Sequence, residues 1–455
     1  MSENNARSTT QKAQTRLSAL NATLPDNDSP PITFPPFDQL PPVAGQPQGS
    51  LWNFFDGRKP SNGEAKSQKD ELGTLNLLTP AVVREASQEI RKGIHVQLDW
   101  GLENVQFPGF KRKKFAHRLV DLYAKVGFVS LDDEVHFNTQ SGSQWDSLKH
   151  FGHQKSRMYY NGLSHEEAVR SERNGIHTWC ERGGIVGRGV LVDWVRWYEE
   201  VKGVPPPSPV TRHEIPVAEL DEVLRFQGTT PRLGDVLIVR SGYVRWHDGA
   251  SEEERRRGTQ ENAVAIGLQS NETTVRWLYD HHFAAVAGDT VAFEKWPPPL
   301  ESGWCLHEWL LTQWGCPIGE MWNLEELSKI CAREGRWTFF LTSAPLNASR
   351  LTLKRHSGPN LILLRARIGR GIDMALDTPD FALGLEQLLP AVLPGVDSAF
   401  QPFAESQARV ALFEGPALVA GEERGADPWS GTVLHCPDAE AAAWGEESGV
   451  AGVVG

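Results

Sequence analysis

Two short apolar runs constrain the fold of this chain more than any other feature of its sequence. One lies in "GDVLIVRSGY" (residues 234–243), and the other lies in "HHFAAVAGDT" (residues 281–290). Apolar runs of this length that are bounded by turn-forming residues predict buried β-strands. A third segment of the same kind, "RWTFFLTSAPLN" (residues 336–347), predicts the last strand of the domain.

A helix and a further strand are predicted nearer the N-terminus. The segment "TPAVVREASQEIRKG" (residues 79–93) has apolar residues at helical spacing, Thr79 as an N-cap and Gly93 at its end. The segment "IHVQLDW" (residues 94–100) follows and predicts a strand.

A second amphipathic helix is predicted for "LHEWLLTQWG" (residues 306–315), with Gly315 able to end it. Its apolar face consists of Leu306, Trp309, Leu310 and Trp314. Alternating helices and strands of this kind predict an α/β domain.

The composition changes at both ends of the chain. Residues 1–35 are polar and rich in Pro, Asn and Ser, which predicts a disordered tail. Residues 36–347 carry the helix and strand signals and are expected to form the main ordered domain. Residues 348–455 contain a single lysine and no further strand pattern, so we expect a loosely ordered C-terminal extension.

Charge and cysteine content limit the class of protein. The formal net charge is −12, which argues against nucleic acid and anionic membranes as partners, because both attract basic surfaces. The basic segment "FKRKKF" (residues 110–115) is interpreted as a solvated turn. Five cysteines without CxxC spacing indicate reduced thiols, and no apolar run predicts a membrane span. A cytoplasmic location is therefore expected.

The segment "NTQSGSQWDSLKHF" (residues 138–151) places a carboxylate, Asp146, four residues before His150. Such a pair could ligate a metal or act as a general acid and base, although this spacing is more often found in a surface pair with no chemistry. The bulky neighbours Trp145 and Phe151 favour partial burial, where ionisable groups need partners.

His307 and Glu320 form a second candidate pair. His307 lies at the start of the predicted helix, and Glu320 follows the chain break at Gly315 and Pro317. A helix followed by such a break can bring residues thirteen positions apart close together. Each residue alone is more typical of a cap or of an exposed side chain than of a metal ligand.

Together these segments resemble the "putative cyclase" family, which includes bacterial kynurenine formamidase and isatin hydrolase, and in particular its branch found in fungi and some actinobacteria. The resemblance covers about residues 40–347. The matching segments, in order, are "KDELGTLNLLTP", "NTQSGSQWDSLKHF", "ERGGIVGRGVLVDW", "GDVLIVRSGY", "GEMWNLEEL" and "FFLTSAPLN". The resemblance implies the swivelling β/β/α fold of that family, with a mixed sheet and a barrel-like core.

The family signature is His-x-Gly-Thr-His-x-Asp-x-x-x-His. In this chain Gln140 and Gln144 occupy the positions of the first two histidines, and Ser143 occupies that of the threonine. Asp146 and His150 match the aspartate and the last histidine, which is the catalytic acid and base of the family. The resemblance therefore implies that His150 is catalytic.

The resemblance also implies a metal site, but in a reduced form. Binuclear members hold one ion with the two signature histidines, whereas Asp146, His307 and Glu320 match the ligands of the second ion. Glutamine amides are poor substitutes for imidazole on zinc. We therefore expect one divalent ion, Zn²⁺ or Mn²⁺, or no ion at all.

These correspondences predict a hydrolase or cyclase that acts on an amide, lactam or lactone bond of a small carbonyl substrate. Residues expected to contact this substrate are Gln140, Gln144, Ser143 and Trp145. One alternative is a metal-independent lyase or cyclase of secondary metabolism, with His150 as the sole acid and base. Another is a non-catalytic binding protein on the same fold. The family also implies a homodimer or homotetramer.

Overall fold

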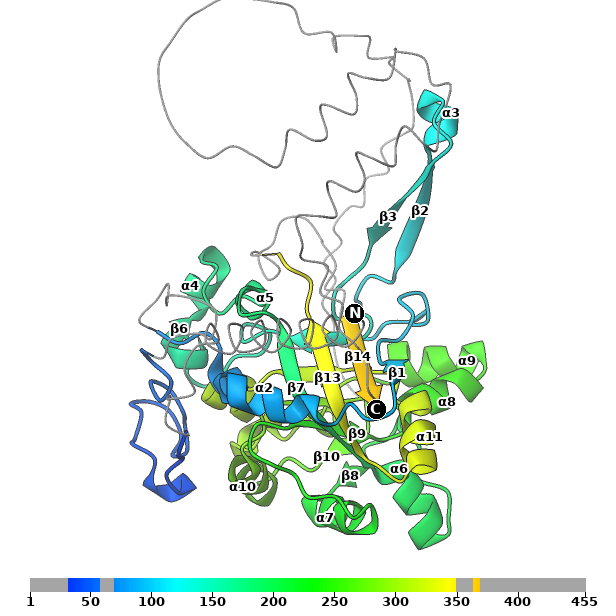
Figure 1. Cartoon of the computed structure of the whole chain (residues 1–455). Helices are drawn as coiled ribbons and strands as arrows, with labels where there is room; N and C mark the ends of the chain where they lie inside the picture. Colours follow the sequence, from blue (N-terminus) through cyan, green and yellow to red (C-terminus); the bar gives the residue numbers. More distant parts are fainter. Residues whose placement is uncertain (1–31, 58–68, 349–362, 369–455) are drawn as a thin grey trace, which may run out of the picture. The chain divides into compact units, whose positions relative to one another are not determined.

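The computed structural model describes residues 32–57, 69–348 and 363–368 (Figure 1). Most of the predicted disordered tail (1–35) and of the predicted C-terminal extension (348–455) therefore lies outside the described residues. None of the helices within the described ranges has the length and apolar character needed to cross a bilayer.

The central element is one sheet of eight strands, in which parallel and antiparallel neighbours are mixed. In spatial order its strands are β1 (Ile94–Gln97), β14 (Leu363–Ile368), β13 (Thr338–Ala344), β7 (Ile185–Asp193), β9 (Val236–Arg240), β11 (Ala285–Gly288), β12 (Ile318–Glu320) and β4 (Gln144–Asp146). The neighbours from β7 to β12 are parallel, and the outer pairings are antiparallel. The six strands from β13 to β4 curl into a half-barrel, so the predicted α/β fold with a mixed sheet and a barrel-like core is confirmed.

The apolar runs form the strands that the sequence predicts. Every residue of β9 and β11 is buried, because helices and loops cover both faces of the parallel part of the sheet. The predicted strands at β1 and β13 are also confirmed.

The C-terminal region departs from the prediction at one point. We expected no further strand after residue 347, but β14 lies between β13 and β1 and pairs antiparallel with both. Its place in the sheet depends on long-range pairing, which a local sequence pattern does not reveal.

The helices flank the sheet and the loops of the site. The α-helices are α2 (Pro80–Ser87), α3 (Leu122–Val126), α4 (His165–Arg170), α5 (His177–Glu181), α6 (Trp194–Trp197), α7 (Val217–Phe226), α8 (Tyr243–Gly249), α9 (Glu252–Arg255), α10 (Glu272–His281) and α11 (Glu325–Glu334). Thr79 caps α2 as predicted, since its side chain accepts a hydrogen bond from Val82 N. The helix ends at Ser87 rather than near Gly93. Glu89, two residues beyond this end, accepts a hydrogen bond from the Arg336 guanidinium.

Shorter elements complete the described chain. They are the two-stranded pairs β2 (Ala116–Asp121) with β3 (Leu131–His136), β5 (Met158–Tyr159) with β6 (Leu163–Ser164), and β8 (Glu214–Ile215) with β10 (Gly267–Leu268), and the 3-10 helices η1 (Phe37–Gln39), η2 (Gly73–Leu77), η3 (Tyr160–Gly162) and η6 (Leu300–Ser302). The π-helices are η4 (Tyr198–Lys202), η5 (Arg256–Glu261) and η7 (Glu308–Trp314).

The helix that follows His307 differs from the predicted amphipathic α-helix. Residues 308–314 form the π-helix η7, and all seven are buried. A wider helix that is enclosed on every side has no single apolar face, so the predicted stripe was only part of its contact surface. π-Helical turns often occur at functional sites, and this one begins directly after a candidate ligand.

The hairpin of β2 and β3, with α3 at its tip, is exposed along both strands except at Val120, and it stands apart from the sheet in Figure 1. It carries several large exposed apolar side chains, including Tyr123, Phe128 and Val129. The segments before and after this hairpin both contribute residues to the candidate site described below, so the hairpin lies between two site-forming segments of the chain. The predicted dimer or tetramer stays a prediction.

Asp289, at the end of β11, fixes the start of α8. Its buried carboxylate accepts hydrogen bonds from the Ser241 N–H and hydroxyl and from the N–H groups of Gly242 and Tyr243, at 2.7–3.1 Å. A carboxylate at a helix N-terminus satisfies donors that have no partner within the helix. This contact locks β9, β11 and α8 together beside the site.

Candidate functional site

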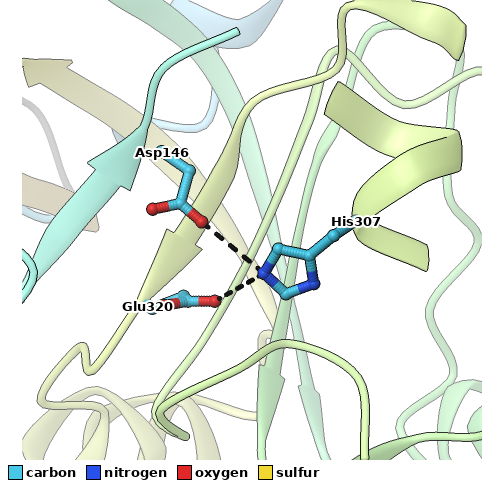
Figure 2. Close-up of side chains that lie close together, drawn as sticks. All are labelled: Asp146, His307 and Glu320. Atoms are coloured by element: carbon cyan, nitrogen blue, oxygen red, sulfur yellow. Dashed lines mark ion pairs between the residues drawn. The ribbon is translucent and has the colours of Figure 1, made fainter. Parts of the chain in front are cut away.

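Three potential metal ligands converge where β4 pairs with β12. Asp146 ends β4 and Glu320 ends β12. In the antiparallel register Asp146 lies opposite Ile318 and Glu320 lies opposite Gln144, so the two carboxylates lie diagonally on the same face of the strand pair. The His307 side chain approaches from the start of η7 (Figure 2). Its Nε2 lies 3.3 Å from Glu320 Oε1 and 3.7 Å from Asp146 Oδ2. All three residues are buried, and one ligand atom from each lies within 4.8 Å of the others.

Glu294 orients the imidazole of His307. Its Oε1 lies 2.6 Å from His307 Nδ1, and the same carboxylate accepts hydrogen bonds from the backbone N–H groups of Leu306 and His307. A carboxylate on Nδ1 fixes the tautomer and directs Nε2 toward the centre of the site, as in carboxylate–histidine–metal arrangements. His307 is therefore preorganised to act as a ligand through Nε2.

The two glutamines at the family histidine positions brace the carboxylates. Gln140 Nε2 donates to Asp146 Oδ1 at 2.7 Å, and Gln144 Nε2 donates to Glu320 Oε2 at 2.8 Å. Gln144 Nε2 also donates to Gln140 Oε1, so the amides form one chain. Each amide holds one oxygen of a carboxylate and leaves the other oxygen facing His307.

The remaining oxygens lack hydrogen-bond partners. Asp146 Oδ2 and Glu320 Oε1 are both buried without a well-formed hydrogen bond among the described residues, and their compensating contacts are ion pairs to His307 Nε2. Orphaned buried carboxylate oxygens are costly unless a cation or a donor compensates them. Together with His307 Nε2 they offer one nitrogen and two oxygens to a single divalent ion, and this ligand set suits Zn²⁺ or Mn²⁺. The residues present therefore fit one ion.

The cluster holds a proton that competes with an ion. Burial, together with the neighbouring Asp146 carboxylate, raises the pKa of Glu320 to about 7. Burial alone would lower the pKa of His307, but Glu294 and Glu320 outweigh this and raise that pKa well above its ordinary value. At neutral pH the proton shared by these groups stabilises the two carboxylates in the place of a metal ion.

His150 lies next to this cluster in a different protonation state. Its Nε2 is 3.9 Å from Asp146 Oδ1, and its side chain keeps 25% of its surface exposed. Burial lowers the pKa of His150, and Asp146 offsets only part of this effect. A neutral imidazole that water can reach is suited to accept a proton.

Three of the residues predicted to contact substrate have buried side chains. Trp145 has no exposed surface, and its Nε1 donates to Ser343 Oγ inside the core. The Ser143 hydroxyl donates to Met321 O and accepts from Trp100 N, and Gln144 is fully buried on Glu320. These three buried side chains support the site through contacts inside the protein, whereas Gln140 lines a pocket beside the site.

Two residues at the site were missed in the sequence. Glu294 belongs to no motif and reaches His307 only through the fold. Arg112 lies in the basic segment that we interpreted as a solvated turn. Its guanidinium donates a hydrogen bond to Gln140 O at 3.1 Å and interacts electrostatically with the carboxylates of Asp146 and Glu320. The aromatic residues interleaved with this segment were the only available signal.

Replacing Glu294 by Gln should weaken metal binding, because an amide cannot fix the His307 tautomer in the same way. We expect the affinity for Zn²⁺ or Mn²⁺ to fall about 10- to 100-fold, measured by competition with a chromophoric chelator. Glu301→Gln, at an exposed position of the same loop, is the matched control and should bind like the unmodified protein. Equal affinities for both variants would contradict the role assigned to Glu294.

Metal affinity should also depend on pH. His307 and Glu320 both have raised pKa values, so protons occupy the ligand atoms at lower pH and an ion must displace them. We expect the affinity to rise from pH 6 to pH 8, by up to about tenfold per pH unit for each proton released. Calorimetry in buffers of different ionisation enthalpy counts these protons, and a pH-independent affinity would contradict this picture.

Comparison with known proteins agrees with this architecture. Residues 62–295 match the model of the family described as "Putative cyclase". A solved structure described as a novel cyclase is 28% identical with a TM-score of 0.55, and the match covers 65% of this chain and 96% of that chain. Isatin hydrolase A from Labrenzia aggregata, bound to benzyl benzoate, is 16% identical with a TM-score of 0.41, covering 65% of this chain and 99% of that chain.

No curated protein matches this chain. The matched region contains Asp146, His150 and Glu294, whereas His307 and Glu320 follow it in the sequence and join it in the fold. Because the family model covers more than half of the chain, the protein belongs to this cyclase family.

Proposed function

We propose that this protein is a metal-assisted hydrolase that cleaves an amide, lactam or lactone bond of a small carbonyl substrate. The observation that carries the proposal is the pair of orphaned oxygens, Asp146 Oδ2 and Glu320 Oε1, which face His307 Nε2 in a buried site. Ion pairs to His307 Nε2 are the contacts that compensate these two oxygens, and a divalent ion held by all three atoms would take the place of those ion pairs.

The side chains divide the chemistry between them. A divalent ion held by Asp146, His307 and Glu320 would polarise the substrate carbonyl and lower the pKa of a water molecule. His150 Nε2 takes a proton from the attacking water as the new C–O bond forms. The same imidazolium then returns that proton to the leaving nitrogen or oxygen as the scissile bond breaks.

The position of His150 supports this role. It lies beside Asp146 but outside the hydrogen-bonded chain of amides and carboxylates, and its lowered pKa keeps it neutral at neutral pH. Asp146 then favours the imidazolium that forms during the reaction, because an opposite charge within a few ångströms stabilises it. One residue therefore alternates between base and acid without displacing a ligand.

Replacing His150 by Ala should give a folded protein with at least about a hundredfold lower kcat, because the proton shuttle is lost. Activity would be measured on a panel of aromatic formamides, lactams and lactones. His153→Ala is the matched control: it removes a histidine of the same loop whose ring contacts Ser156 instead. Unchanged activity in the His150 variant would remove it from the mechanism.

A second function is favoured by one observation, the amide chain of Gln140 and Gln144. Because these glutamines already donate a hydrogen bond to one oxygen of each carboxylate, a metal-independent lyase or cyclase with His150 as its sole acid and base is the competing proposal. A non-catalytic binding protein would require the same pocket without turnover.

Metal removal separates these functions. We expect one equivalent of a divalent ion in the purified protein by elemental analysis, and a loss of that ion in Asp146→Ala. Activity should fall to background after chelation and return when Zn²⁺ or Mn²⁺ is added. Activity that survives exhaustive chelation would favour the metal-independent enzyme, and a metal-free protein that turns over no member of the panel would favour the binding protein.

A further inference from the structure

The π-helix η7 is enclosed by the protein, yet three of its seven residues are polar. They are Glu308, Thr312 and Gln313, with exposed fractions of 5%, 0% and 0%. A buried polar side chain is costly unless it is hydrogen-bonded, so each of the three is expected to hold a specific partner. The partners of Glu308 and Thr312 lie in one loop, and that loop follows His150 directly.

Both hydrogen bonds join η7 to the backbone of this loop. Thr312 Oγ1 donates to Phe151 O at 3.0 Å, and Glu308 Oε1 accepts from Gln154 N at 2.8 Å. The two side chains are four residues apart, about one helical turn, so they reach the loop from one side of η7. They bind the two ends of residues 151–154 and tie this segment to the helix.

The start of the same helix carries the candidate ligand His307. This residue directly precedes Glu308, and Glu294 orients its imidazole separately. The ring of Phe151 packs against that of His307 with 5.3 Å between centroids, and the rings of His150 and His307 are 6.4 Å apart. The helix η7 therefore holds both halves of the candidate site, the ligand at its start and the loop that carries the proposed base.

The imidazole of His150 depends on its backbone for its position. Its ion pair with Asp146 measures 3.9 Å from Nε2 to Oδ1, which is longer than a hydrogen bond. Within the described residues, no hydrogen bond reaches either ring nitrogen of His150. On the N-terminal side the chain is anchored by Lys149, whose Nζ donates to two carbonyl oxygens at the C-terminal end of α4. The two side chains of η7 are the anchors on the C-terminal side.

We propose that Glu308 and Thr312 are positioning residues for His150, and that η7 thereby sets the distance between the acid/base and the candidate ion site. The proposal rests on the proposed function in one respect, because it takes His150 as the group that moves the proton. In that role a displacement of about 1 Å can lower the rate about a hundredfold. Apolar packing alone is non-directional, whereas these two hydrogen bonds fix the register of the loop along η7.

Paired substitutions separate each hydrogen bond from the bulk of the side chain. Thr312→Val keeps the branched shape and removes the hydroxyl, whereas Thr312→Ser keeps the hydroxyl. Glu308→Leu removes the acceptor, whereas Glu308→Gln keeps an acceptor oxygen for Gln154 N. Gln313→Met is the matched control, because Gln313 is buried in the same helix but donates to Gln46 Oε1 rather than to the His150 loop.

The imidazole of His150 is followed directly by NMR of the full-length protein with ¹³C-labelled histidine at about pH 8, and His150→Ala assigns its signal. Burial lowers the pKa of His150, so the ring is neutral at this pH and its signal reports surroundings rather than charge. We expect the signal of the unmodified protein in Thr312→Ser, Glu308→Gln and Gln313→Met. In Thr312→Val and Glu308→Leu we expect a displaced or split signal.

Steady-state kinetics on the panel of formamides, lactams and lactones gives a second measurement. We expect kcat to fall about tenfold or more in Thr312→Val and Glu308→Leu, and to recover in Thr312→Ser and Glu308→Gln. A purely structural role would lower the melting temperature without changing kcat or the His150 signal, and this is the behaviour expected of Gln313→Met.

The proposal is overturned if the His150 signal is unchanged in either Thr312→Val or Glu308→Leu, if Gln313→Met changes it as much, or if these two variants keep the kcat of the unmodified protein. If Glu308→Leu does not fold, the two Thr312 variants carry the test alone. The NMR measurement requires neither turnover nor a bound ion, so an inactive unmodified protein would contradict the proposed hydrolase and leave this test intact.

Discussion

Two buried carboxylates held close together are the constraint on which the site depends. The pairing of β4 with β12 sets Asp146 and Glu320 diagonally on one face, and like charges in a desolvated site raise the free energy of the fold unless partners compensate them. This chain divides the compensation among two amides, the His307 imidazole and a more distant guanidinium. The amides donate hydrogen bonds to one oxygen of each carboxylate, and the other oxygen of each carboxylate faces His307 Nε2.

The same constraint explains what the glutamines do. At the family histidine positions they were expected to contact substrate, but an amide N–H beside a carboxylate forms a strong charge-assisted hydrogen bond. Gln140 and Gln144 therefore form a hydrogen-bonded wall along one edge of the two carboxylates, in which each amide N–H compensates one carboxylate oxygen without carrying a charge.

Sequence reasoning succeeded where a signal is local or carried by a motif. The strands around Val236 and Ala285 follow from unbroken apolar runs. Asp146 followed from the family signature, and His307 and Glu320 followed from the wider family resemblance; the structure brings these three together. It failed where the signal is tertiary. Glu294 reaches His307 across a loop, and the π-helical form of residues 308–314 depends on enclosure on every side.

Strand β14 has a consequence for where this domain can be cut. It is the partner that joins β1 to the sheet, and it covers the hydrogen-bonding edge of β13. A chain shortened at residue 347, where the family resemblance stops, would leave the amide and carbonyl groups of β13 open along one side and β1 without its neighbour. Open edges of this kind pair readily with other chains, so a truncated version would tend to self-associate through its backbone, even with every residue of the active site in place.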